Sequence, residues 1–275
     1  MINLGLILGV ARSGTSWIHT VLSQSDTPMR SIKEPLRIFN NLVGNAPEFG
    51  MKDFRTFGDI KAFLDNPDHP FLTAIRSCMN LKLNNHKKVL RNDNIYTYCL
   101  IKEIGALLNV PSFIAASKHS KIILVVRDPL YVIDSLFSIH NSINYFCTPI
   151  NELPYGIEIA DGISKNDREY DILKRYTAVK RVQDDFYCFA EHYPENVYLV
   201  EYEKICKKPY FYFKKMTKFL KLSWGDNENS FLQETMSETK EGYYSIYRKT
   251  EDQIGRKFRF LSEKEVNLCK GLDNL

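Results

Sequence analysis

The stretch GVARSGTSW, residues 9–17, lies between a nearly continuous apolar run and a helical pattern. The apolar run, residues 2–10, has the pattern of a strand that is buried on both faces of a parallel sheet. After the glycine-containing stretch, apolar residues from Trp17 to Leu22 recur with helical spacing. A strand, a loop and a helix in this order predict the opening of a doubly wound α/β sheet.

A second strand of the same kind is expected at residues 121–126, KIILVV, and it ends in Arg127-Asp128-Pro129. Asp128 suits the N-cap and Pro129 the first position of a following helix, which we expect to reach His140. Further elements are predicted with less regular patterns. They are strands near residues 29–32, 98–101 and 196–200, and helices over residues 168–192, 210–220 and 262–272.

These elements predict an α/β fold with three layers, α/β/α, around a central, mostly parallel sheet. We expect one domain over residues 1–275, because the chain shows no internal repeat, low-complexity segment or Pro/Gly/Ser linker. Residues 40–66 and 145–167 are less regular, and the second stretch has the length of a lid or binding loop.

The composition excludes some classes of partner. Lys and Arg number 37 against 33 Asp and Glu, a net charge of +4 that is too small to predict nucleic-acid binding. The first apolar run is too short for a membrane span and lacks the features of a signal peptide. The cysteines are widely spaced without a zinc or CxxC pattern, so we expect free thiols and a cytoplasmic protein. They are Cys78, Cys99, Cys147, Cys188, Cys206 and Cys269.

The loop after the first strand has the properties of an anion cradle. Backbone N–H groups and the positive end of the helix dipole meet at such a turn. Ser13, Thr15 and Ser16 add hydroxyl donors. Gly9 and Gly14 have the spacing of a Walker A loop, but Thr15 occupies the position of the lysine that a P-loop kinase uses. The cation lies instead within the loop, at Arg12.

Arg12-Ser13-Gly14-Thr15-Ser16-Trp17 resembles the 5′-phosphosulfate loop of sulfotransferases that use 3′-phosphoadenosine-5′-phosphosulfate (PAPS), [KR]-S-G-T-[ST]-[WFL]. The resemblance implies a P-loop-NTPase-like fold, and it implies that all six residues bind the nucleotide donor. Arginine at the first position is more usual in carbohydrate and tyrosylprotein sulfotransferases than in cytosolic small-molecule sulfotransferases, which carry lysine.

A second resemblance concerns the 3′-phosphate of the same nucleotide. Val126-Arg127-Asp128-Pro129 with Ser135 is similar to the family pattern of an arginine at a strand end and a serine on the next helix. Arg127 would leave the carboxyl end of a strand, where ligands of open α/β sheets bind, and its planar fork suits phosphate. Tyr247-Arg248-Lys249 resembles the C-terminal basic loop of the family, so Arg248 is a further expected ligand, with Lys249 and Arg256 weaker candidates.

The resemblance implies sulfuryl transfer from PAPS, with PAP as the product and no metal required. Arg12 would stabilise charge near the bridging oxygen. Glu34 follows an expected strand about one strand–helix–strand unit after the loop, and several family members use a glutamate there, so Glu34 is the expected general base. Arg37 and Lys102 are weaker candidates for contact with the acceptor. None of the six histidines stands in a matching motif.

The sequence therefore predicts a sulfotransferase that acts on a hydroxyl or amine of a small-molecule or glycan acceptor, with a carbohydrate or glycoconjugate favoured by Arg12 and Glu34. A P-loop-like nucleotide-dependent kinase stays open as an alternative, as does a nucleotide-binding module without catalysis. The sequence leaves the acceptor and the oligomeric state undecided.

Overall fold

A computed structural model describes residues 3–34, 89–104, 110–117, 119–137, 168–240, 246–247 and 249–273. Its elements alternate between strands and helices and end in a helical tail. In chain order they are β1 (Asn3–Gly9), α1 (Thr15–Leu22), β2 (Met29–Lys33), β3 (Val89–Asn92), β4 (Tyr98–Glu103), α5 (Val110–Ala116), β5 (Lys121–Val126), α6 (Pro129–Phe137), α7 (Arg168–His192), β6 (Val197–Glu201), α8 (Tyr202–Lys207), α9 (Pro209–Leu220), α10 (Asp226–Ser237), the 3₁₀ turn η4 (Glu251–Gln253) and α11 (Glu263–Leu272).

The predicted elements recur within one or two residues of their expected bounds, and the helix expected over residues 168–192 has those bounds. The Asp128 cap is present, because the N–H of Leu130 donates to Asp128 Oδ1 at 2.8 Å. The expected continuation of α6 to His140, and residues 40–66 and 145–167, lie outside the described residues.

The sheet has the strand order β3-β2-β4-β1-β5-β6. Every neighbouring pair is parallel except β2 with β3. The mostly parallel sheet that the sequence predicts is therefore present. Strand β3 was not predicted, because its sequence VLRN is short and half polar. An edge strand of this kind carries no continuous apolar run for a pattern to detect.

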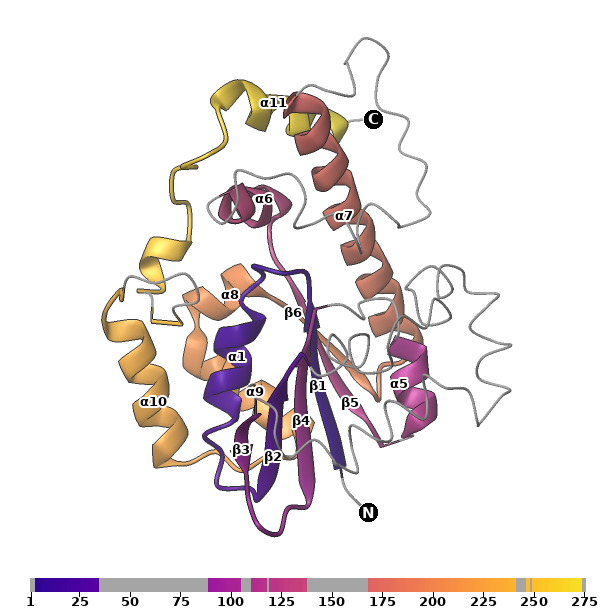
Figure 1. The fold of residues 1–275 in the computed structure, drawn as a ribbon, viewed down its shortest axis with the longest axis vertical. Helices are drawn as coiled ribbons and strands as arrows, with labels where there is room; N and C mark the ends of the chain where they lie inside the picture. The colour runs from indigo at the N-terminus through magenta and orange to yellow at the C-terminus, as the bar shows by residue number, and fades with distance from the viewer. Residues whose placement is uncertain are drawn as a thin grey trace.

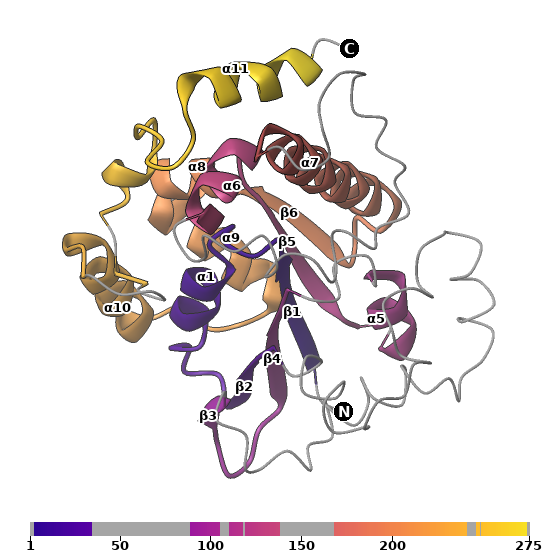
Figure 2. The same ribbon diagram turned by 45° about the horizontal axis from the view of Figure 1, so that its top comes forward.

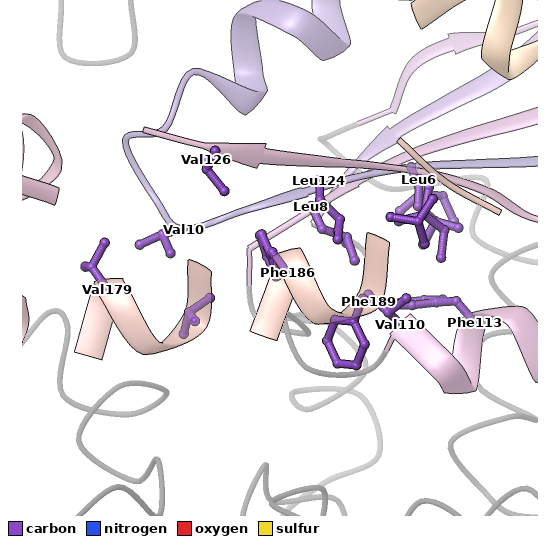
Figure 3. Packing of buried hydrophobic residues seen from close by; sticks show 14 of the residues in the cluster. Leu6, Leu8, Val10, Val110, Phe113, Leu124, Val126, Val179, Phe186 and Phe189 are labelled. Carbon is purple, nitrogen blue, oxygen red and sulfur yellow. The ribbon is translucent and has the colours of Figure 1, made fainter. Parts of the chain in front are cut away.

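Helices cover both faces of the sheet, which gives the three predicted layers (Figures 1 and 2). In β1, β4 and β5, alternate residues point to opposite faces. One set, which includes Leu6, Leu8 and Leu124, packs against α5 and α7. Figure 3 shows this layer, with Phe186 of α7 and Phe113 of α5 beneath the strands. The other set, which includes Ile7 and Ile123, packs against α1, α8, α9 and α10.

A third apolar cluster lies beyond the sheet and joins α6, α7 and α11. Ile133 of α6, Ile172 of α7 and Cys269 of α11 are all buried in it. The C-terminal chain therefore passes beside α6 on its way to α7, as the yellow segment in Figure 1 shows. The segment before α11, which includes Thr250 and Gln253, lies close to the carboxyl edge of the sheet.

The described residues bear on two expectations from the sequence, one about membrane-spanning segments and one about the cysteines. Within them, no helix combines the length and apolar character needed to cross a bilayer. The cysteines in the same part of the chain, Cys99, Cys188, Cys206 and Cys269, are free thiols.

Tyr98 provides a test of the packing on β4. The ring lies against Gly5, where a Cβ atom would approach the Tyr98 hydroxyl to 2.5 Å. The hydroxyl is buried without a hydrogen-bond partner among the described residues, and burial raises its pKa. Tyr98→Phe should therefore leave the free energy of unfolding unchanged or slightly higher, as measured by urea denaturation, because no bond is lost.

Tyr176→Phe is the matched control. The Tyr176 hydroxyl donates to the Asp273 carboxylate, with distances of 2.8 and 2.7 Å to its two oxygens. Its loss should lower the free energy of unfolding by about 1 kcal/mol. A larger loss from Tyr98→Phe than from Tyr176→Phe would contradict the placement of Tyr98.

Candidate functional site

The loop between β1 and α1 reverses the chain over a very short distance. Arg12 and Gly14 both have left-handed backbone conformations, with φ of 74° and 88°. The N–H of Ser13 donates to the carbonyl oxygen of Val10 at 3.1 Å and tightens the turn. Glycine adopts such a φ freely, whereas an arginine there costs about 1–3 kcal/mol and persists only when its surroundings require it.

The two glycines of the loop are required by close packing. A Cβ atom on Gly14 would lie 2.2 Å from Cε2 of Tyr202, because the tyrosine ring lies against the backbone at this point. On Gly9 it would lie 2.6 Å from Cγ2 of Thr15. Close packing therefore explains why glycine occupies positions 9 and 14, the two positions whose spacing resembles a Walker A loop.

The start of α1 offers the donors that an anion needs. Gly14 is the N-cap and supplies no side-chain cap to the first-turn N–H groups. Ser13 Oγ is buried and has no hydrogen-bond partner among the described residues. Uncapped amides and an unsatisfied buried hydroxyl at a helix N-terminus fit a phosphate or sulfate group.

The structure brings together the two motifs that the sequence predicts to bind the nucleotide. Arg12 Nε donates to Ser135 Oγ at 2.9 Å. The Arg127 guanidinium donates through Nη1 to the carbonyl oxygen of Arg12 at 2.7 Å. Arg127 is nearly buried, so its charge is directed into the site and not into solvent.

Three residues that sequence reasoning did not assign to the site surround Arg127. Gln183 of α7 donates through Nε2 to the Arg127 carbonyl oxygen at 2.6 Å. The Tyr202 ring centre lies 4.5 Å from the Arg127 guanidinium carbon, within cation–π range. Glu203 Oε1 lies 3.9 Å from Arg127 Nε. Burial raises the pKa of Glu203, and the positive charge of Arg127 opposes that shift.

Sequence signals for these residues are weak. Tyr202 and Glu203 belong to the stretch VEYEKI, residues 200–205, which begins in β6 and has no chemistry of its own to reveal a role. Gln183 is one polar residue on a long amphipathic helix. Only the fold places these side chains next to Arg127.

A cavity lies between the loop, α8 and the C-terminal chain. Most of the predicted nucleotide ligands from the two motifs lie along it. Its lining consists of Arg12, Gly14, Ser16, Trp17, Arg127, Tyr202, Ile246, Thr250 and Gln253. Ser13 and Thr15 are buried and are not part of this lining. Trp17 is anchored by its indole N–H, which donates to Thr235 Oγ1 at 3.0 Å.

The C-terminal chain reaches the site, because Ile246, Thr250 and Gln253 line the cavity. Arg248 lies outside the described residues. Arg256, a weaker candidate, forms an ion pair with the buried Asp134 through Nη1 and Oδ2 at 2.9 Å. Its guanidinium is therefore directed toward α6.

Glu34 lies at the carboxyl end of β2, at the same edge of the sheet. Its N–H donates to the carbonyl oxygen of Lys102 at 2.6 Å, and its backbone is left-handed with φ 52°. Lys102 Nζ donates to Glu34 Oε1 at 2.5 Å. Lys102 thus holds the carboxylate that the sequence predicts as the base. Arg37 lies outside the described residues.

A buried histidine lies beneath this pair. His19 Nε2 is 3.0 Å from Ser31 Oγ. Burial lowers the His19 pKa well below its usual value, and the charges of Lys33 and Lys102 lower it further. The imidazole therefore stays neutral at physiological pH, and we assign it a structural role.

Comparison with protein families finds one matching family, described as the sulfotransferase family, over residues 6–226. Curated protein sequences contain no match. Solved structures similar to the chain include a mouse sulfotransferase complexed with PAP, at 15% identity over 99% of this chain and 82% of that chain, with a TM-score of 0.46. The sulfotransferase domain of a Synechococcus olefin synthase matches at 13% identity over 98% and 94%, with a TM-score of 0.49. A sulfotransferase from Alicyclobacillus acidocaldarius matches at 16% identity over 92% and 96%, with a TM-score of 0.44.

Gly14→Ala tests the loop. The new Cβ would meet the Tyr202 ring and would strain a φ of 88°, so the loop must move. We expect a loss of stability of about 1–3 kcal/mol and at least tenfold weaker binding of the 3′,5′-bisphosphate PAP, measured by thermal unfolding and calorimetry.

Gly271→Ala is the control, because Gly271 lies on α11 and a Cβ atom added there would meet nothing within 4 Å. The substitution introduces neither a clash nor a strained φ. Equal loss of PAP binding in the two variants would show that the contact between Gly14 and Tyr202 is irrelevant to the site.

Proposed function

The chain belongs to the sulfotransferase family, and from this we propose that it transfers a sulfuryl group from PAPS to an acceptor hydroxyl or amine by in-line displacement. The supporting observation is the direct contact of Arg12 with Ser135 and of Arg127 with the Arg12 backbone. Both contacts lie at the carboxyl edge of the sheet, beside an uncapped helix N-terminus, where an anionic ligand of an α/β fold binds.

In this proposal the loop binds the 5′ end of the donor. The N–H groups from Ser13 to Ser16 and the Ser13 hydroxyl donate to the phosphosulfate, and Trp17 forms part of the cavity wall. Arg127 and Ser135 bind the 3′-phosphate, with Arg248 as a further proposed ligand. When bound, PAPS supplies an activated sulfuryl group and leaves as PAP.

Arg12 has two proposed tasks. Its backbone carbonyl accepts from Arg127, and its guanidinium lies beside Ser135, between the two ends of the donor site. From this position it can stabilise the negative charge that develops on the leaving oxygen. An electrostatic donor of this kind commonly contributes a factor of about 10²–10³ in rate. The scheme requires no metal, and this metal independence stays a prediction.

Glu34 is the proposed general base. A carboxylate oxygen of Glu34 takes the proton of the acceptor hydroxyl, while Lys102 keeps the side chain at the sheet edge through its 2.5 Å contact with Oε1. The left-handed backbone of Glu34 supports this assignment, because strain of that kind is concentrated at functional sites.

The acceptor that we favour is a carbohydrate or glycoconjugate, on the combination of Arg12 in the loop with a glutamate base. The alternatives that an acceptor screen must include are a phenol, a protein tyrosine and an amine. The single domain and the cytoplasmic location also stay predictions.

Calorimetric titration with PAP, with ATP and Mg²⁺ as the comparison, tests the donor. We expect wild-type protein to bind PAP with a dissociation constant near the micromolar range, about −8 kcal/mol, and to bind ATP more weakly. Arg127→Ala should abolish PAP binding, because it removes a buried cation that also supports the loop. Arg181→Ala, which replaces an exposed arginine on α7 that does not line the cavity, should bind PAP like wild type. Better binding of ATP with Mg²⁺ would favour a kinase and overturn the proposal.

Glu34→Gln tests the base. Formation of PAP from PAPS can be followed with p-nitrophenol, glucosamine and a tyrosine peptide as acceptors. With any acceptor that wild type uses, kcat should fall by a factor of about 10²–10⁴ because proton transfer is lost. PAP binding should change little. Glu201→Gln removes another carboxylate–lysine contact, at 2.6 Å from Lys204 on the surface, and should keep full activity. Full activity of Glu34→Gln would exclude Glu34 as the base.

A further inference from the structure

Asp134 of α6 is a buried carboxylate next to Ser135 in sequence, and its side chain faces the C-terminal chain. Its Oδ1 accepts from the backbone N–H groups of Arg259 and Phe260 at 2.8 Å each and of Leu261 at 3.3 Å. Its Oδ2 forms the ion pair with Arg256 at 2.9 Å. Only 1% of the residue is exposed. A buried carboxylate is stable only when donors of this kind satisfy it.

Tyr131, one turn earlier on α6, contacts the same segment. Its hydroxyl donates to the carbonyl oxygen of Arg256 at 3.2 Å. Its ring centre lies 5.0 Å from that of Phe258 at an interplanar angle of 33°. One face of α6 therefore binds the chain from Arg256 to Leu261 through an ion pair, four hydrogen bonds to the backbone and a ring contact.

The segment anchored in this way directly follows the far wall of the nucleotide cavity. Ile246, Thr250 and Gln253 line that wall. Only Ile254 and the left-handed Gly255 separate Gln253 from Arg256. The position of the wall therefore depends on where Arg256 and the residues after it are bound. The opposite side of the cavity depends on α6 too, because Arg127 precedes this helix and Ser135 lies on it.

Contacts that do not involve Asp134 anchor α11. Arg168 Nε of α7 contacts Glu265 Oε1 at 2.7 Å and the Arg168 guanidinium also donates to the carbonyl oxygen of Phe260, and the Tyr176 hydroxyl binds Asp273. Loss of Asp134 should consequently release the chain before α11, near the cavity, more than it releases α11 itself.

We propose that Asp134 is a positioning residue for the nucleotide: it binds the C-terminal segment to α6 so that Thr250 and Gln253 face Arg12 and Arg127 across the cavity. This inference rests on the proposed function. It assigns Arg256 a role as the partner of Asp134 and not as a phosphate ligand. The ligand concerned is a 3′,5′-bisphosphate nucleotide, for which PAP is the probe.

The expected effect is on affinity. If Asp134→Ala leaves the wall in place in about a tenth of the molecules, the dissociation constant for PAP rises about tenfold. The KM for PAPS should rise similarly, whereas kcat at saturating PAPS should stay within about twofold, since bound donor restores the wall. Asp134→Asn keeps an oxygen for the three N–H groups and loses only the ion pair, so its effect should be smaller.

A coupling experiment separates the ion pair from packing. Arg256→Gln should weaken PAP binding by the same factor as Asp134→Asn, and the double variant should be no worse than either single variant. Additive losses would show that Arg256 contacts the phosphate itself and would overturn its assignment.

Tyr176→Phe is the control for stability alone. It removes the hydrogen bond to Asp273 at the C-terminal end of α11, so the melting temperature should fall while PAP affinity stays within about twofold of wild type. Should Asp134→Ala fail to fold, Asp134→Asn and Arg256→Gln carry the same test.

The outcomes separate the two proposals. Failure of wild-type protein to bind PAP overturns the proposed function. Binding by wild type with an unchanged affinity in the Asp134 variants overturns only the positioning role. An affinity loss in Tyr176→Phe as large as that in Asp134→Ala also overturns it, because the effect would then follow stability.

Discussion

The hydrogen bond from the Arg127 guanidinium to the carbonyl oxygen of Arg12 joins two parts of the chain on which the whole site depends. It links the carboxyl end of β5 to the loop after β1, and it supports a backbone conformation that an arginine would not adopt alone. With its backbone in that conformation, Arg12 can direct its side chain to Ser135. A buried cation thus shapes the loop before any ligand arrives, which lowers the reorganisation that binding requires.

The parts of the fold that the sequence predicts are those with local causes. The apolar runs of β1 and β5 are buried on both faces, and the Asp128 cap is a contact between near neighbours. The edge strand β3 and the side chains of Gln183 and Asp134 were not predicted, because their roles depend on residues far away in sequence. Arg12 contacts Ser135 and Glu34 lies at the end of β2, and the roles of all three residues stay predictions.

Charge at the carboxyl edge of the sheet is arranged in pairs, and the small net charge of the chain conceals this. Lys102 contacts Glu34, and Arg127 lies near Glu203. An anion site requires several cations, and pairing with carboxylates limits the repulsion among them. Pairing also keeps each side chain in a defined direction. The neutral state of His19 has a related origin, since Lys33 and Lys102 add to the effect of burial and oppose a further positive charge beneath them.

The placement of Thr250 and Gln253 in the cavity has a consequence for synthesis of the protein. A ribosome makes β1, the loop and every strand of the described sheet before it makes these residues. Domains begin to fold as they emerge, so a nascent chain can assemble its sheet while one side of the cavity is still open. Under the proposed function, nucleotide would then bind fully only to chains whose translation has passed Arg256 and the segment that Asp134 binds.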